Sequence, residues 1–260
     1  MNDRVNSFAR QALPPLIGLV LLIGVWYLAT LKGGSIPGPG PTWDAAAKLF
    51  ADPFYSNGPN DQGIGWNVLS SLKRVAIGFG IAAAVGIPLG FLLGRFEFMS
   101  RMMDPIISLL RPVSPLAWLP IGLLVLKKAD PAATWTIFIC SIWPMILNTA
   151  EGVRRVPQDY LNVARVLGLP ESKVITKILF PAVLPYMLTG IRLSIGTAWL
   201  VIVAAEMLTG GVGIGFWVWD EWNNLKVEHI VIAIFVIGIV GLILEQILLF
   251  LARRFSYESR

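Results

Sequence analysis

The chain has 260 residues, of which 55% are hydrophobic and only 14% are charged, and its mean hydropathy is +0.69. Soluble domains carry about 25% charged residues, so this composition excludes an ordinary soluble enzyme. One cysteine, Cys140, and one histidine, His229, exclude an internal disulfide and a His-rich metal site. The net charge of +5 indicates membrane topology rather than nucleic-acid binding, because Lys and Arg are retained on the cytoplasmic side of a membrane.

Six stretches are apolar and long enough to cross about 30 Å of hydrocarbon, which takes about 20 residues of helix. In chain order they are residues 11–31, 75–94, 106–126, 131–150, 182–205 and 230–249. We therefore predict an all-α polytopic membrane protein with about six transmembrane helices. Residues 1–260 are expected to form a single transmembrane domain, in which the first helix and an outer loop occupy residues 1–65.

Residues 1–31 also resemble a signal peptide, because a basic start precedes an apolar run. The run ends at Lys32-Gly33-Gly34 without a small-x-small cleavage site, so we expect an uncleaved first helix, with a cleaved one as the alternative. A loop rich in glycine and proline follows at 33–41, and a short amphipathic stretch follows at 43–50. Both are expected on the outer surface.

The basic residues predict the orientation of the chain. If the N-terminus is cytoplasmic, twelve Lys and Arg residues fall on the cytoplasmic side and seven on the outer side. Cytoplasmic loops carry the excess of these residues. We therefore expect both termini in the cytoplasm.

Small residues recur every four positions along the second span, at Gly78, Ala82, Gly86, Gly90 and Gly94. Lipid supplies no hydrophobic drive between helices, so such a face marks a place where two helix backbones approach closely. We interpret it as packing within this chain, with a subunit interface as the alternative.

Three prolines interrupt the third span, at Pro112, Pro115 and Pro120. Each removes a backbone donor and disfavours helix just before its ring, so we expect this span to be broken or bent. Irregular backbone at membrane depth is tolerated where protein or a water-filled cavity covers it. We interpret the break as the wall of a transport pathway, with a structural kink as the alternative.

Two arginines, Arg111 and Arg192, lie inside predicted spans, where a charge costs at least about 2.5 kcal/mol and marks a functional site by default. The alternative is that both side chains extend to the cytoplasmic interface. Glu206 ends the fifth span before a glycine-rich stretch, 209–215, and an aromatic band, 216–222, which is either an interface belt or a gate. The residues predicted to line an anion path are Arg111, Ser114, Arg192, Ser194 and Glu206.

A polar and basic stretch at 151–181 lies between the fourth and fifth spans. It predicts two short helices, 158–167 and 171–180, separated by Gly168-Leu169-Pro170, because glycine suits a helix end and proline the next start. A helix-turn-helix between spans has no role in lipid. Its exposed face is therefore expected to meet a soluble protein in the cytoplasm.

This stretch resembles the EAA loop, Glu-Ala-Ala-x3-Gly-x9-Ile-x-Leu-Pro, of permease subunits of binding-protein-dependent ABC importers. The spacing is kept, while Asn162, Val163 and Phe180 replace the glutamate, the first alanine and the leucine. The resemblance implies that residues 159–170 sit in a cleft of an ATPase subunit. The coupling residues that it implies are Asp159, Asn162, Ala164, Arg165, Gly168, Ile178 and Pro181, with Asp159, Asn162 and Arg165 as candidates for the polar contact.

The resemblance covers about residues 66–252, the importer permease core. The stretches 70–79, 110–120 and 198–208 are similar to the nitrate, bicarbonate and sulfonate branch of this family, and residues 209–229 are most similar to nitrate permeases. The resemblance implies a type I ABC importer permease fold. It also implies import of a small inorganic oxyanion, nitrate or nitrite first, with bicarbonate or a sulfonate such as taurine as the alternative.

The partners implied by the resemblance are a second copy of this chain, two ABC ATPase subunits that bind ATP and Mg, and an extracytoplasmic binding protein, at the bacterial cytoplasmic (inner) membrane. None of the eight lysines follows a glycine, so the phosphate-binding loop GxxxxGK[ST] is absent. We expect no catalytic, cofactor or metal site in this chain, and no nucleic-acid partner. A secondary transporter driven by an ion gradient is the alternative, and intramembrane acids or internal repeats are typical of that class.

Overall fold

The computed structural model describes residues 2–31, 33–34 and 36–255, and the side chains of residues 13–31, 33–34 and 36–250. Within these ranges the regular elements are all helices: α1 (Asn2–Thr30), α2 (Pro39–Leu49), α3 (Ile64–Arg95), α4 (Glu97–Leu110), α5 (Pro115–Leu126), α6 (Ala129–Arg154), α7 (Gln158–Val166), α8 (Glu171–Lys173), the π-helix η1 (Val174–Leu179), α9 (Phe180–Thr209), α10 (Ile214–Asn223) and α11 (Val227–Phe255). The predicted all-α fold class is confirmed.

Among the described residues, five helical runs are long and apolar enough to cross a membrane, and the count is six if the bent pair of α4 and α5 forms one span. The prediction of about six spans is therefore confirmed. α3 is longer than predicted, because it begins at Ile64 rather than at residue 75. Its extra turns carry Asn67 and Ser71, two polar side chains that a search for apolar stretches rejects but that the fold buries.

The third span is broken, as predicted. The helix axis bends by 99° between α4 and α5, and the residues between them include Pro112. Pro115 begins α5, where its missing N–H is not needed for helix hydrogen bonds. Pro120 lies within α5 and does not end it. The span also begins earlier than predicted, at Glu97.

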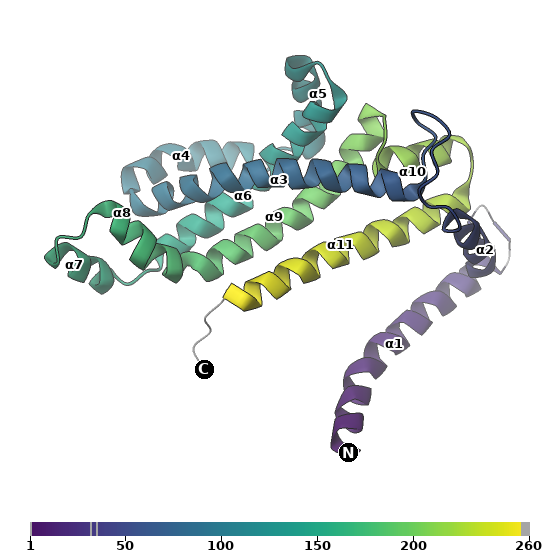
Figure 1. Cartoon of the computed structure of the whole chain (residues 1–260), viewed down its shortest axis with the longest axis horizontal. Coiled ribbons are helices and arrows are strands. Elements are labelled where there is room, and N and C mark those ends of the chain that lie inside the picture. The colour runs from purple at the N-terminus through teal and green to yellow at the C-terminus, as the bar shows by residue number, and fades with distance from the viewer. Residues whose placement is uncertain (1, 32, 35, 256–260) are drawn as a thin grey trace.

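α3, α6 and α9 form the centre of the bundle, and α11 packs along α9 (Figure 1). The small-residue face of α3 lies against α6. A Cβ atom added to Gly90 would lie 2.6 Å from the Cβ atom of Thr149, and one added to Gly94 would lie 2.5 Å from that of Val153. The interpretation of this face as packing within the chain is therefore confirmed.

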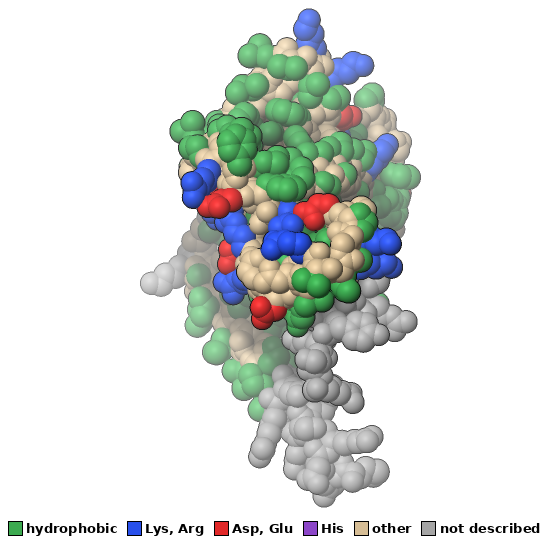
Figure 2. Space-filling view, turned by 90° about the vertical axis from the view of Figure 1, so that its left-hand side faces the viewer, with side chains coloured by type: hydrophobic (Ala, Val, Ile, Leu, Met, Phe, Trp, Pro, Cys, Tyr) green, Lys and Arg blue, Asp and Glu red, His purple; other side chains and the backbone are tan. Residues whose placement is uncertain are grey.

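The bundle has two distinct ends. α3 and α6 both run from the end that carries α2 and α10 to the end that carries α7 and α8, and α9 runs back (Figure 1). We call these the α10 end and the α7 end. Figure 2 views the α7 end and shows Lys and Arg side chains gathered over it.

α1 diverges from the bundle (Figure 1). None of its residues from Leu13 to Thr30 is buried. It is held at the α10 end, where Trp26 Nε1 donates a hydrogen bond of 3.0 Å to the Pro37 carbonyl and the Trp26 ring lies 5.9 Å from that of Phe235. The apolar side chains along α1 are thus left to lipid or to another chain.

The predicted short helix at 171–180 is wrong as a separate element. α8, η1 and α9 form one helical run of 39 residues from Glu171 to Thr209. In a regular α-helix, Pro181 would clash with the carbonyl four residues earlier. The wider π turn of η1, which ends just before α9, accommodates this proline. The fifth span therefore continues into the predicted coupling loop without a break.

Candidate functional site

α7 carries most of the predicted coupling residues. It packs onto the bundle through Leu161 and Ala164, which are both buried. Asp159, Asn162 and Arg165 are exposed, and Arg165 Nη1 lies 3.4 Å from Asn162 Oδ1. Ala164 therefore serves packing, whereas the three polar side chains face outward.

An exposed apolar surface accompanies these polar groups. It comprises Tyr160, Val163, Val166 and Leu167, and the most exposed of them is Val166, at 87%. We call these four residues the α7 surface. Contiguous exposed apolar groups at the polar end of a bundle are typical of a docking site for another protein. Ile178 is half-buried and Pro181 is exposed on the helical run that follows.

Gly168 ends α7 with a left-handed backbone, at a φ of +63°. Its N–H donates to the Arg165 carbonyl at 3.1 Å, and the Leu169 N–H donates to the Ala164 carbonyl at 3.0 Å. These two bonds form a Schellman motif, which requires a positive φ at this position. No atom lies within 4 Å of a Cβ added to Gly168, so the requirement for glycine is conformational.

The α7 end is tied to α3 by charge. Arg95, the last residue of α3, makes an ion pair of 2.8 Å with Glu171, the first residue of α8. Arg154, the last residue of α6, donates a hydrogen bond to Ser100 of α4. The segment that carries α7 is therefore tied to α3 at its end, and α6, which precedes it, is tied to α4.

A buried carboxylate organises the opposite end. Glu206 of α9 is 1% exposed. It accepts hydrogen bonds from Ser71 Oγ at 2.7 Å, from Arg74 Nη1 at 2.6 Å and from the Gly215 N–H at 3.0 Å. A buried charge requires such partners, so Glu206 joins α3, α9 and the start of α10.

The start of α10 depends on the same cluster. The Gly213 N–H donates to Asn67 Oδ1 at 2.8 Å, and the Ile214 N–H donates to Ser71 Oγ at 2.9 Å. Side chains of α3 thus satisfy backbone donors that a helix start leaves unpaired. A Cβ added to Gly215 would lie 2.0 Å from the Val203 carbonyl oxygen. The glycine-rich stretch is therefore held tightly between α3 and α9.

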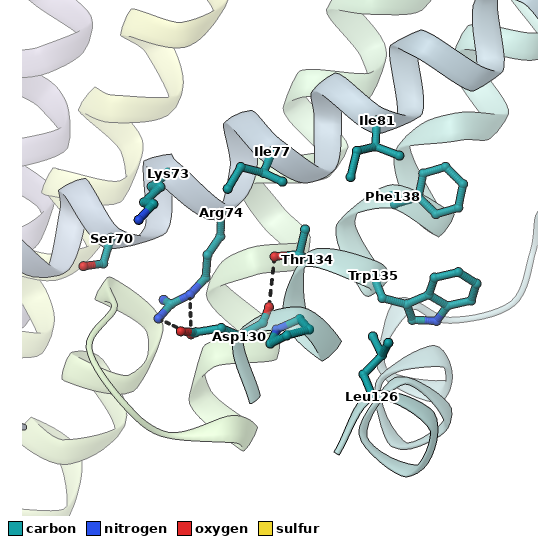
Figure 3. Close-up of a pocket in the computed structure, with 11 residues that line it drawn as sticks. Ser70, Lys73, Arg74, Ile77, Ile81, Leu126, Asp130, Thr134, Trp135 and Phe138 are labelled. Atoms are coloured by element: carbon teal, nitrogen blue, oxygen red, sulfur yellow. Dashed lines mark hydrogen bonds and ion pairs between the residues drawn. The ribbon is translucent and has the colours of Figure 1, made fainter. Parts of the chain in front are cut away.

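Arg74 extends this cluster to the surface. Its Nη1 also donates to the Val212 carbonyl at 2.7 Å. Its Nε and Nη2 lie 2.9 and 2.6 Å from Asp130 Oδ1, at the start of α6 (Figure 3). The Arg74–Asp130 pair borders a cavity of about 670 Å³ between α3, α5 and α6, and a second of about 570 Å³ toward the α9–α10 loop.

The structure separates the residues predicted to line the path into three places. Arg111 and Ser114 are exposed at the α4–α5 break. Arg192 pairs with Glu245 of α11, with 2.9 Å between Nε and Oε1. Ser194 and Glu206 are buried within this chain, and Ser194 Oγ donates to the Ser141 carbonyl of α6 at 2.6 Å. Neither Ser194 nor Glu206 lines an open surface of the described chain, because packing between helices enclosed both side chains. The role of these two residues in a path stays a prediction.

Sequence reasoning missed Ser71, Arg74 and Asp130. The predicted second span begins at residue 75, so Arg74 falls just outside it, on the outer side. Asn67, Ser71 and Arg74 recur at spacings of four and three residues, which puts them on one helix face. That periodicity, together with an acid at Glu206 that needs a partner, is the signal that points to the cluster.

A second carboxylate links α10 to α11. Glu221 lies 2.9 Å from His229 Nδ1 and 3.4 Å from Lys226 Nζ. Burial alone would raise the pKa of the Glu221 carboxyl, but the hydrogen bond and charge of His229 and the charge of Lys226 outweigh it and hold this pKa below its ordinary value. Because the pKa of this carboxyl is lower in the folded state than in the unfolded state, its ionised form stabilises the folded protein at pH values above the unfolded pKa, which is about 4.3 for glutamate. This stabilisation is lost as the pH falls through the folded-state pKa.

We therefore expect the free energy of unfolding to fall by about 1.5 kcal/mol, the lower value for a hydrogen bond to a charged group, as the pH drops below about 4.3. Thermal unfolding in detergent from pH 7 to pH 3 measures this. A Glu221→Gln variant should be less stable at pH 7 and should lack this step. The same acid step in that variant would assign it to other groups.

Comparison with known proteins decides the family. A model of the family described as "Binding-protein-dependent transport system inner membrane component" matches residues 86–257. The chain belongs to this family. Its members are transport subunits, so this permease is a multi-pass membrane protein and not an enzyme.

Similar permeases carry two substrate names. The chain is 46% identical over 245 residues to the nitrate import permease protein NrtB of Synechocystis sp., covering 94% of this chain and 89% of that protein. It is 45% identical over 238 residues to the bicarbonate transport system permease protein CmpB of the same organism, covering 90% of this chain and 85% of that protein. The expected resemblance to the nitrate and bicarbonate branch is confirmed.

The fold is also found among solved structures. A chain of the MetNI methionine ABC transporter, in an inward-facing conformation, matches with a TM-score of 0.56 and 16% sequence identity, and the match covers 72% of this permease and 92% of that chain. At this identity the match concerns the fold alone. The expected type I ABC importer permease fold is confirmed.

Proposed function

We propose that this permease imports a small inorganic oxyanion, with nitrate as the first candidate. The identity of 46% to a nitrate import permease, over 94% of the chain, carries this proposal. Bicarbonate is the second candidate, because the identity to a bicarbonate permease is 45%. A difference of one percentage point in sequence identity does not discriminate between two small monovalent oxyanions. A transport measurement therefore decides between them.

The proposed assembly contains two copies of this chain, two ABC ATPase subunits that bind ATP and Mg, and an extracytoplasmic binding protein. The proposed orientation places the α7 end and both termini in the cytoplasm. Six crossings, with α4 and α5 counted as one span, return the chain to the side from which it starts, and Lys and Arg gather over the α7 end (Figure 2). The α10 end then faces outward.

The α7 surface is the proposed contact with the ATPase. Asp159, Asn162 and Arg165 supply its polar contacts, and Gly168 ends the helix. The helical run from Glu171 to Thr209 connects this end to the Glu206 cluster at the other. A rigid helix transmits displacement along its axis, so movement of α7 against the ATPase is transmitted toward the α10 end. Ala164, Ile178 and Pro181 shape this segment rather than contact the partner.

Within the membrane, Arg111 and Ser114 remain the proposed path residues. Both are exposed at irregular backbone, which requires cover by protein or water at membrane depth. Arg192 also remains a proposed path residue, and its charge is paired with Glu245 of α11 within the chain. Ser194 and Glu206 are proposed to position helices.

Reconstitution tests the function. The chain, co-expressed with a cognate ATPase and binding protein, is placed in proteoliposomes, and ATP hydrolysis is measured with nitrate, bicarbonate or an alkanesulfonate. Stimulation by nitrate above the other anions is the expected result, and stimulation by bicarbonate alone would establish the second candidate. Uptake by this chain without any ATPase would overturn the proposal in favour of a secondary transporter.

Replacing Gly168 with Val should uncouple the ATPase. A β-branched residue in the left-handed region is strained by about 1–2 kcal/mol. This strain lowers the ratio of molecules with a correctly ended α7 to molecules without it by about 5- to 30-fold. We expect oxyanion-stimulated ATP hydrolysis to fall accordingly while the protein remains inserted. Gly168→Asn is the matched control, because Asn tolerates this conformation. Equal activity of the two variants would contradict the role of the Schellman motif.

A further inference from the structure

We propose that the Nε–Nη2 edge of Arg74 is a binding site for a small planar oxyanion, and that the Asp130 carboxylate occupies it here as an internal stand-in. This inference rests on the proposed function and adds to it a place where the imported anion is bound. The site lies at the α10 end, which is the outer end in the proposed orientation.

The two sides of the Arg74 guanidinium are held differently. Nη1 is committed to the fold, because it donates to Glu206 at 2.6 Å and to the Val212 carbonyl at 2.7 Å. Nε donates to Asp130 Oδ1 at 2.9 Å, and Nη2 forms an ion pair of 2.6 Å with the same oxygen. The inner contacts therefore orient the guanidinium, and the outer edge presents two donors.

Asp130 fills this outer edge incompletely. Both donors meet the same carboxylate oxygen, so the pair is not the two-oxygen fork that an arginine makes with an ideally placed carboxylate. A planar trigonal anion such as nitrate or bicarbonate presents two oxygens in one plane, which matches the two parallel donors of this edge. The geometry thus favours an incoming oxyanion over the resident side chain.

Exposure makes Asp130 exchangeable. Its side chain is 73% exposed, whereas that of Glu206 is 1% exposed and that of Arg74 is 13% exposed. An exposed ion pair is weak because water and salt screen it. Asp130 can therefore release Arg74 without disturbing the buried half of the cluster.

The surroundings suit an anion. Ser70, Lys73 and Thr134 line the larger cavity beside Arg74, and the wall farther from this arginine is apolar (Figure 3). Lys128 lines the smaller cavity, which shares Arg74 and Asp130 with the larger one. Three basic residues and one carboxylate, that of Asp130, therefore line the two cavities, and the basic residues attract an anion to them.

The test compares the complete transporter with variants by thermal unfolding, with sodium nitrate titrated against sodium chloride at equal ionic strength. In Asp130→Asn the competing carboxylate is gone. The nitrate concentration that gives half of the stabilisation should fall by up to about fivefold. An exposed ion pair changes an equilibrium constant by no more than about this factor, and the variant removes such a pair from competition with nitrate. Asp130 is exposed, so this variant is expected to fold. Arg74→Lys keeps a charge near Glu206 but lacks the two-donor edge, and should abolish the nitrate-specific shift.

Glu171→Gln is the matched control. Arg95 also directs Nε and Nη2 to one oxygen of an exposed carboxylate, that of Glu171, but it lies at the α7 end and outside the proposed path. The control should leave the nitrate concentration that gives half of the stabilisation unchanged. An equal fall in Glu171→Gln would assign the effect to any released arginine and overturn the site, as would an unchanged value in Asp130→Asn.

The two proposals fail in different ways. If the wild-type transporter moves neither nitrate nor bicarbonate in proteoliposomes, the proposed function fails, and the site loses its substrate. If it moves nitrate but Asp130→Asn leaves the half-saturating nitrate concentration unchanged, the site fails while the function stands.

Discussion

Replacing Glu206 with Ala is expected to lower the free energy of unfolding by about 3–5 kcal/mol, the cost of breaking one side of a buried ion pair. The variant leaves Arg74 Nη1 without its buried partner. It also removes an acceptor from the Ser71 hydroxyl and from the Gly215 N–H. The start of α10 should therefore loosen together with the α3–α9 contact. Unfolding by SDS titration in mixed micelles measures the loss.

Asp130→Asn is the control for this prediction, because it removes the other carboxylate from the same arginine. Asp130 is 73% exposed, and exposed pairs contribute about 0–1 kcal/mol. The free energies of unfolding expected for the two variants thus differ widely, although each change removes one carboxylate that contacts Arg74. Similar losses in the two variants would show that burial does not set the energy of this cluster.

Replacing Gly90 with Leu is expected to cost up to about 3 kcal/mol, since inserted methylenes force a packed interface apart. The Cβ atom alone would lie 2.6 Å from Thr149 Cβ and 2.8 Å from the Ile146 carbonyl oxygen. α3 and α6, two of the three central helices, would have to separate. The expected result is a lower thermal midpoint and less monodisperse protein after detergent extraction.

Gly80 supplies the matched control on the same helix. It is exposed, and no atom lies within 4 Å of a Cβ added there. Gly80→Leu should therefore leave stability unchanged or raise it slightly, because leucine has the higher helix propensity. Equal destabilisation at both positions would attribute the effect to α3 itself rather than to its contact with α6.

Much of the fold could be predicted from local sequence. An apolar stretch of about 20 residues is a property of adjacent residues alone, and so is a proline that disrupts a helix. The broken third span was predicted from its prolines, and the small-residue face was predicted from small residues spaced four apart. Helix bounds were less certain, because Asn67 and Ser71 are polar and yet buried in α3. The π turn before Pro181 leaves no clear mark in composition.

The candidate site divides in the same way. The exposed polar groups of α7 and the left-handed Gly168 followed from motif spacing, which depends on residues close together in the chain. The Arg74 cluster did not, since Arg74 and Glu206 are 132 residues apart and Arg74 and Asp130 are 56 apart. Nothing in the sequence between them specifies that the side chains meet.

By itself, the sequence determined that this is a polytopic helical transport protein, because hydropathy and motif spacing are local. Only the tertiary structure decided which charges are neutralised. It buried Glu206 against Arg74, paired Arg192 with Glu245 and left Asp130 exposed. The physical reason is that the energy of a charge depends on its burial and on the distance to its partner, and packing of distant helices sets both.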